Sequence, residues 1–183
     1  MKQRGLTQRA LLGAGVITIS ILLVGLISML GDRTRFEALP TGDQLGQDSG
    51  EAFADYAVRA QDSLATAPAD EQVYGLVTFT SALPPERASS ALESLARINA
   101  VVPPDAAPIA VGEPQQGHDR SQIFEMAVRD QPISSVVARD EGETFRRLAE
   151  RDDIATVEVL PADAVWGAFG IRPVDTGAAH GDE

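Results

Sequence analysis

The sequence predicts an α+β fold class, in which an N-terminal transmembrane helix is followed by a small ferredoxin-like (split βαβ) extracytoplasmic domain. Two observations lead to this prediction. The segment from Ala10 to Leu30 holds no charged residue and is rich in Leu, Ile and Val, and as a helix it would be roughly 31 Å long, close to the thickness of a bilayer's hydrocarbon core. From Val73 to Leu160 the chain then shows the order strand, helix, strand, strand, helix, strand, which is typical of a split βαβ domain.

Charges that flank the apolar segment predict its orientation. Lys2, Arg4 and Arg9 precede it, and Arg33 and Arg35 follow it, which favours a cytoplasmic N-terminus. A cleaved signal peptide is the alternative, but its apolar region is usually about 7 to 15 residues long and ends at a small-residue cleavage site. The expected localisation is therefore the cell membrane, as a single-pass protein whose bulk is extracytoplasmic.

Composition divides the chain into five parts. Gly, Asp, Thr and Gln dominate the residues that follow the apolar segment, and Gly, Ala and Asp dominate the C-terminus; both compositions are typical of solvated, irregular chain. The expected parts are a cytoplasmic tail (1–9), a transmembrane helix (10–30), a flexible stalk (31–49), an extracytoplasmic α+β domain (50–166) and a largely disordered tail (167–183).

Helices are predicted at three places after the stalk. Apolar residues recur at helical spacing from Glu51 to Leu64. A second helix begins at Pro84-Pro85, because proline is favoured in the first turn, and its apolar face extends to Ile98. Asp140-Glu141-Gly142-Glu143 resembles a capping box that begins the third.

Strands are predicted from β-branched and alternating residues. The segments are Val73–Phe79, Ile109–Val111, Ile133–Arg139 and Ile154–Leu160. Ile123 to Arg129 fits either an extended segment or a short helix, and both alternatives stay open.

The charge balance excludes some functions. The chain carries 27 Asp and Glu against 15 Lys and Arg, a net charge of −12. A nucleic-acid-binding protein needs a basic surface, so no nucleic-acid partner is expected. Because the chain has no cysteine, it has no thiolate nucleophile and no cysteine-based metal site.

Motifs for catalysis are also missing. The only histidines are His118, in a polar loop, and His180, in the predicted tail, and a Ser-His-Asp triad needs a histidine held in place. No H-E-x-x-H, calcium-loop or phosphate-loop motif occurs. We therefore predict no catalytic residue, no metal ligand, no cofactor and no enzyme; a hydrolase that uses His118 is the less favoured alternative.

One segment offers candidate binding residues. Val165 to Ile171 contains the single tryptophan, and glycines separate its large apolar side chains. The segment either folds back to complete the core or exposes an anchor for a partner, and tryptophan is common among the residues that dominate binding energy. We predict Trp166, Phe169 and Ile171 as partner-binding residues, with an exposed sheet edge as a second place of contact.

Some segments carry a resemblance to known families. The run Phe-Arg-Arg-Leu-Ala-Glu-Arg-Asp-Asp-Ile-Ala-Thr-Val-Glu-Val resembles the final helix and strand of subtilisin-type propeptide and inhibitor domains. The same arrangement is similar to the extracytoplasmic domain of the cell-division permease that activates peptidoglycan hydrolases. A strand that ends in Val-Thr-Phe and a Pro-Glu helix start resemble uncharacterised single-pass envelope proteins of high-GC Gram-positive bacteria.

The expected function is therefore that of a single-pass membrane-anchored protein. Its acidic extracytoplasmic interaction domain would bind an envelope or membrane protein, and small residues in the apolar segment would permit a homodimer through the transmembrane helix. The alternative, which the propeptide resemblance implies, is a membrane-tethered protease inhibitor or propeptide-like module.

Overall fold

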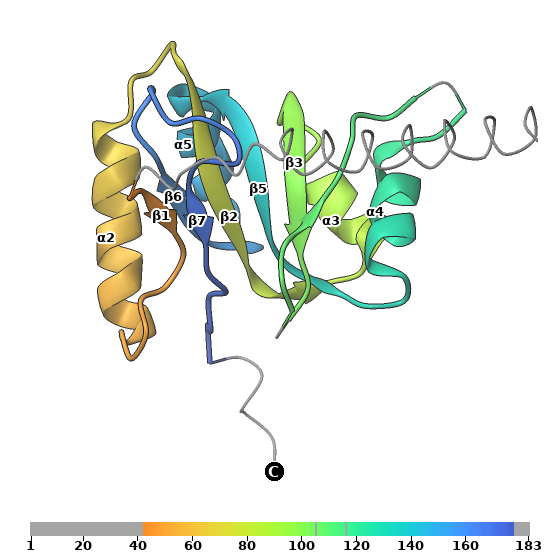
Figure 1. Ribbon diagram of the computed structural model, residues 1–183, viewed down its shortest axis with the longest axis horizontal. Coiled ribbons are helices and arrows are strands. Elements are labelled where there is room, and N and C mark those ends of the chain that lie inside the picture. Colours follow the sequence, from red (N-terminus) through yellow and green to blue (C-terminus); the bar gives the residue numbers. More distant parts are fainter. Residues whose placement is uncertain (1–41, 105, 116, 178–183) are drawn as a thin grey trace, which may run out of the picture. The chain divides into compact units, whose positions relative to one another are not determined.

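Two β-sheets organise the residues that the structure describes, 42–177 apart from 105 and 116. In this computed structural model, one sheet has the strand order β4-β3-β5-β2-β6, and β1 pairs with β7 in a separate sheet (Figure 1). The strands are β1 (Gln44–Leu45), β2 (Gln72–Leu83), β3 (Arg97–Val102), β4 (Ile109–Ala110), β5 (Ile133–Glu141), β6 (Ile154–Val159) and β7 (Gly170–Ile171). The helices are α2 (Phe53–Thr66), α3 (Pro85–Ala91), α4 (Arg120–Val128) and α5 (Gly142–Ala149).

Two crossovers, each skipping one strand, join the four longer strands. β2 is antiparallel to both β5 and β6, and β3 is antiparallel to β5. The first crossover runs from β2 through α3 to β3, with β5 between the two strands; the second runs from β5 through α5 to β6, with β2 between them. This strand order is that of a split βαβ arrangement. It is extended by β4 and α4 between the crossovers, and by α2, β1 and β7 outside them.

The predicted fold class needs a correction that concerns the transmembrane helix. Its residues, 10–30, lie outside the described part of the chain, as does the predicted cytoplasmic tail, 1–9. None of the helices within the described residues combines the length and the apolar character that crossing a bilayer requires. By this finding the predicted fold class with an N-terminal transmembrane helix is wrong, as is the predicted localisation as a single-pass cell-membrane protein. For residues 42–177 the fold class is α+β with four helices and two sheets.

Helices α3, α4 and α5 pack on one face of the five-stranded sheet and form the first core with it. Alternate residues of β2 point to this face, as the period of a strand requires. The helices contribute aliphatic and aromatic side chains that are almost fully buried: Ala88, Ala91, Phe124, Val128, Phe145 and Leu148.

Gly75 in β2 lets α5 approach the sheet closely. Phe145 of α5 is fully buried, and a Cβ atom on Gly75 would lie 2.9 Å from its Cζ atom. The phenyl ring therefore fills the space that a side chain at position 75 would need. A larger residue there would push Phe145 out of the first core.

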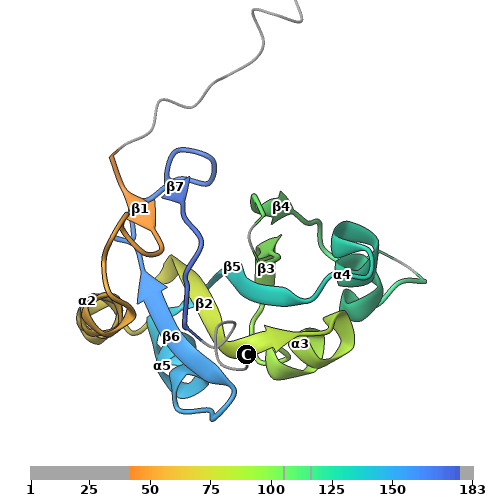
Figure 2. The ribbon, with the colours of Figure 1, turned by 90° about the horizontal axis from the view of Figure 1, so that it is seen from below.

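Helix α2 lies beside the edge strand β6 and, with the small β1–β7 sheet, forms the second core on the opposite face (Figure 2). Its last turn also contributes Leu64 to the first core. Tyr56 and Ala60 of α2 are fully buried, as the predicted helical spacing indicated. Leu45 of β1 is also fully buried. β1 lies within the segment predicted as a stalk, and β7 lies within the segment predicted as a tail. Both ends of the described chain thus help to cover this face.

The helix predicted to run to Ile98 stops early, because α3 ends before Leu92 and β3 already contains Ile98. Arg120 of α4 donates hydrogen bonds to the carbonyl oxygens of Leu92 and Leu95, with distances of 2.6 and 2.8 Å. These carbonyl groups follow the helix end, where intrahelical partners run out. A contact from a distant element therefore stabilises the early end of the helix.

The segment left open between strand and helix, Ile123 to Arg129, is mostly helical and belongs to α4. A capping box begins this helix: the Asp119 carboxylate accepts from the Gln122 amide, and the Gln122 side chain accepts from the Asp119 amide. The capping box predicted at Asp140 is wrong. Asp140 belongs to β5, and its carboxylate accepts a hydrogen bond from the backbone amide of Ala96 at 2.5 Å.

Candidate functional site

The loop between β6 and β7, together with β7 itself, contains the residues predicted to bind a partner. Trp166 is 37% exposed, and Val165 beside it is 60% exposed. Phe169 is buried, and Ile171 in β7 is half-buried against the second core. The loop therefore presents Trp166 to solvent, while the residues that follow attach it to the protein.

Two other aromatic rings support the indole of Trp166. Its ring centroid lies 5.9 Å from that of Tyr74 in β2 and 5.8 Å from that of Phe169. The rings of Tyr74 and Phe169 are 5.3 Å apart. All three distances fall within about 4.5 to 7 Å, the range in which tilted aromatic pairs attract one another. Figure 1 shows this loop beside the end of the sheet at which β2 begins.

Two arginines extend this surface across the sheet. Arg139 in β5 is the register partner of Tyr74 in β2 on one side and of Arg97 in β3 on the other. Side chains of register partners share a face, with Cβ atoms roughly 4.5 to 5.5 Å apart, so the three residues form a row. The Arg139 guanidinium carbon lies 5.4 Å from the centre of the Tyr74 ring, which is a cation–π contact. We call the surface made by Tyr74, Arg97, Arg139, Val165 and Trp166 the aromatic–arginine patch.

Arg139 differs from the other half-buried arginines among the described residues. Arg59, Arg120, Arg146 and Arg172 each donate hydrogen bonds to a carboxylate or a carbonyl group. The Nε atom of Arg139 is buried and has no hydrogen-bond partner within residues 42–177. Buried donors of this kind are rare, because water or protein groups usually satisfy them.

Neighbouring carboxylates neutralise the two arginines only weakly. Arg97 Nε lies 3.8 Å from a Glu113 carboxylate oxygen, and both side chains are about half exposed; exposed pairs of this kind contribute little. Glu141 follows Arg139 by two residues and is exposed. Like charges directly opposite each other on one face of a sheet are destabilising. The patch therefore places two adjacent positive charges on a chain whose net charge is −12.

A buried ionic network occupies another part of the second face. The Glu158 carboxylate in β6 accepts hydrogen bonds from Arg59, from the Gly46 backbone amide at 2.5 Å and from the Tyr56 hydroxyl at 3.4 Å. Arg59 also pairs with Glu51 at 2.9 Å. Burial raises the pKa of Glu158, and the Gly46 amide and Arg59 oppose this shift. The network attaches α2 and the segment before it to β6, which is a structural role.

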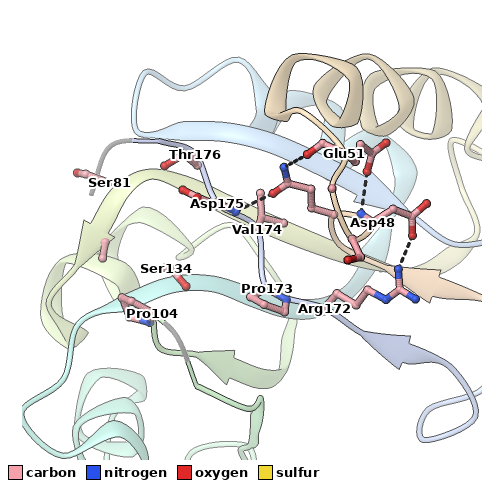
Figure 3. A pocket seen from close by; sticks show the side chains of 14 residues that line it. Asp48, Glu51, Ser81, Pro104, Ser134, Arg172, Pro173, Val174, Asp175 and Thr176 are labelled. Atoms are coloured by element: carbon pink, nitrogen blue, oxygen red, sulfur yellow. Dashed lines mark hydrogen bonds and ion pairs between the residues drawn. The ribbon is translucent and has the colours of Figure 1, made fainter. Parts of the chain in front are cut away.

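A pocket of about 700 Å³ lies between the loop that precedes α2 and the segment that follows β7 (Figure 3). Its charged groups are mostly paired within the protein. Arg172 pairs with Asp48 at 2.5 Å, and the Asp175 backbone amide donates to the Gln47 side chain at 2.8 Å. Figure 3 shows these contacts along the rim of the pocket. Since its polar groups already bind one another, this pocket is a weaker candidate than the aromatic–arginine patch.

The described residues offer little support for the less favoured hydrolase. His118 is exposed in the loop before α4. The carboxylate of its neighbour Asp119 binds the Gln122 amide and the Ser121 hydroxyl, so it serves to cap the helix. Within residues 42–177, apart from 105 and 116, no three His, Cys, Asp or Glu side chains come close enough to hold a metal ion.

The sheet edges do not offer the second contact place that the sequence suggested. β6 forms one edge, but Val157 and Val159 in it are only 3% and 6% exposed. The Val159 amide donates to the Ser63 hydroxyl of α2 at 2.9 Å. β4 forms the other edge and has only two residues. Added strands need an accessible row of backbone groups, and neither edge provides one of useful length.

Comparisons with known proteins identify no relative: no family model, no curated protein and no solved structure matches the chain.

Proposed function

We propose that this chain is a non-enzymatic interaction module that binds a protein partner through the aromatic–arginine patch. The supporting observation is an exposed indole, Trp166, packed on two other rings beside two adjacent arginines. Tryptophan, tyrosine and arginine are enriched among the residues that dominate binding energy. A supported indole also loses little conformational freedom when it is covered, so more of the contact energy remains for binding.

Site-specific photocrosslinking in the source cells tests this proposal. A photoreactive amino acid replaces Val165, which is 60% exposed within the patch, or Val58, which is 59% exposed on α2. We expect a discrete crosslinked protein from position 165 and none from position 58. Mass spectrometry identifies the crosslinked protein, which is then purified for binding measurements with the full-length chain.

Variants then connect the identified partner to the patch. Trp166→Ala should weaken binding by about thirtyfold or more, the loss typical of a residue that dominates an interface. Met126→Ala, which removes a side chain that is 58% exposed on α4, should leave the affinity unchanged. Circular dichroism checks that both variants fold. Equal affinities for Trp166→Ala and the unmodified protein, or equal crosslinking from both positions, would reject the proposal.

A further inference from the structure

We infer that the partner segment bound at the aromatic–arginine patch is an acidic peptide, in which an Asp or Glu carboxylate lies next to a large apolar side chain. This inference rests on the proposed function and adds the chemistry of the partner. Carboxylate oxygens would accept hydrogen bonds from Arg139 and Arg97, and the apolar side chain would cover Trp166 and Val165.

The arginine row supplies the first argument. Arg139 and Arg97 are register partners on one face of the sheet. Arg139 turns toward Tyr74 in β2, and Arg97 turns toward Glu113, which follows β4, so one or two carboxylates of a short peptide can reach them. Planar guanidinium groups bind carboxylates through two parallel hydrogen bonds. The contact with the Tyr74 ring holds one face of the Arg139 guanidinium. Its Nε atom is buried, so the terminal N–H groups of this half-buried side chain are the ones left for a ligand. An anion here would also relieve the repulsion between the two arginines.

The apolar neighbours supply the second argument. Val165 and Trp166 are the most exposed large apolar side chains of the β6–β7 loop. An apolar side chain packed on them would exclude water from the adjacent arginines, and ion pairs strengthen as water is excluded. A carboxylate alone would remain solvated and bind weakly. The patch therefore fits a carboxylate and a large apolar side chain that belong to neighbouring residues of one peptide.

The net charge of the chain favours a peptide over a nucleic acid as the ligand of the patch. Affinity for nucleic acid comes from many neutralised phosphates, whereas this patch contains two arginines on a chain of net charge −12. A long polyanion would extend over acidic surface and be repelled. A short peptide with one or two carboxylates need only contact the patch, and charges beyond roughly 8 Å are screened at physiological salt.

The test uses short random peptides displayed on phage and selected on the purified full-length chain. Selected peptides are synthesised twice, once unchanged and once with each Asp and Glu replaced by Asn and Gln. Trp166 is the single tryptophan, so a change in its fluorescence reports binding at the patch. The variants are Arg139→Gln and Arg97→Gln, with Arg87→Gln as the matched control, because Arg87 is exposed on α3.

We expect the selected peptides to carry a carboxylate beside an apolar residue and to change Trp166 fluorescence. Neutralising the peptide, or introducing Arg139→Gln, should weaken binding about tenfold or more. Arg97→Gln should weaken binding by a smaller factor, because the Arg97 side chain is more exposed. Arg87→Gln should have no effect, and the neutralised peptide should not distinguish the arginine variants. If Arg139→Gln does not fold, Arg97→Gln with both peptides still decides the question.

Four outcomes would overturn the inference. Peptides that lack carboxylates but still change Trp166 fluorescence would reject an acidic partner and leave the proposed function standing. Peptides that bind without affecting Trp166, or a selection that yields no binding peptide, would reject both. A single-stranded oligonucleotide that displaces the selected peptide at equal concentration would replace the peptide by a nucleic acid.

Discussion

The two faces of the five-stranded sheet differ in what covers them and in the polar groups they bury. Helices α3, α4 and α5 cover the first face, and its buried strand residues are apolar apart from Asp140 of β5, whose carboxylate accepts a hydrogen bond from the Ala96 amide. Helix α2 and segments from both ends of the described chain cover the second face. Four of its strand residues are buried and polar: Thr78, Ser135, Thr156 and Glu158. The aromatic–arginine patch belongs to the second face, so the less uniform core and the candidate site occur together.

Matched phenylalanine variants would test whether the first face carries more of the stability. Phe145 is fully buried against Gly75 in the first core, whereas Phe169 borders the exposed Trp166 in the second. Phe145→Ala should reduce the free energy of unfolding by about 3 to 5 kcal/mol, because it leaves a cavity that cannot collapse. Phe169→Ala should cost about 1 to 3 kcal/mol, since its loop can move into the space.

Urea unfolding of the full-length chain, followed by circular dichroism, measures both values. Equal losses would show that the second face is packed as rigidly as the first. The two cores would then differ in the polar groups they bury but not in their contribution to stability.

Local apolar periods on both faces explain which elements could be predicted from the sequence. α2 and β6 were predicted closely, because each has a local apolar period that burial preserves: Tyr56, Ala60 and Leu64 in the helix, Val157 and Val159 in the strand. Local periodicity does not show where a helix ends when that end depends on a contact from a distant segment, as α3 depends on Arg120. The predicted helix therefore continued through Arg97, where the structure has a strand.

Because of that difference, the sequence could not place Arg97 in the candidate site. Assigned to a helix, Arg97 could not be placed opposite Arg139, whose strand was predicted correctly. Trp166 could be proposed from composition alone, since it is the single tryptophan in a segment of large apolar residues. The row of Tyr74, Arg139 and Arg97 depends on the register of three strands, which a single sequence does not specify.

Two reciprocal substitutions on β5, Ser135→Ala and Ala138→Ser, would sharpen the comparison of buried polar groups on the two faces. Ser135 and Ala138 are both fully buried on this strand but face opposite sides of the sheet. Ser135 Oγ has no hydrogen-bond partner within the described residues. Ala138→Ser should destabilise the fold by about 1 to 3 kcal/mol, because it adds an unpaired hydroxyl to an apolar core.

Ser135→Ala should change stability by less than about 0.5 kcal/mol or increase it slightly, because it removes a hydroxyl that is already unpaired. Urea midpoints of the two variants, measured beside the unmodified protein, provide the comparison. A large loss from Ser135→Ala would mean that its hydroxyl has a partner such as bound water. The second face would then be as fully satisfied as the first.

The smallest expected effect is a pH dependence confined to the second face. Burial raises the pKa of Glu158 above its ordinary value of about 4.5, so the folded state holds this proton more tightly than the unfolded state. The contribution of Glu158 to stability is then fully present below about pH 4.5 and is lost as the pH rises through the folded-state pKa. Arg59, the Gly46 amide and the Tyr56 hydroxyl face this carboxylate, and they limit how far its pKa rises.

Glu158→Gln cannot titrate at this position, so the difference in unfolding free energy between the unmodified protein and the variant isolates the effect. That difference should shift against the unmodified protein as the pH rises above about 4.5, by at most about 1.4 kcal/mol per pH unit, and then level off. Unfolding measured between pH 4 and 7 at constant salt provides the curve. A difference that grows in favour of the unmodified protein over this range would mean that Arg59 outweighs burial, and that the ionic network stabilises the second face through its charge.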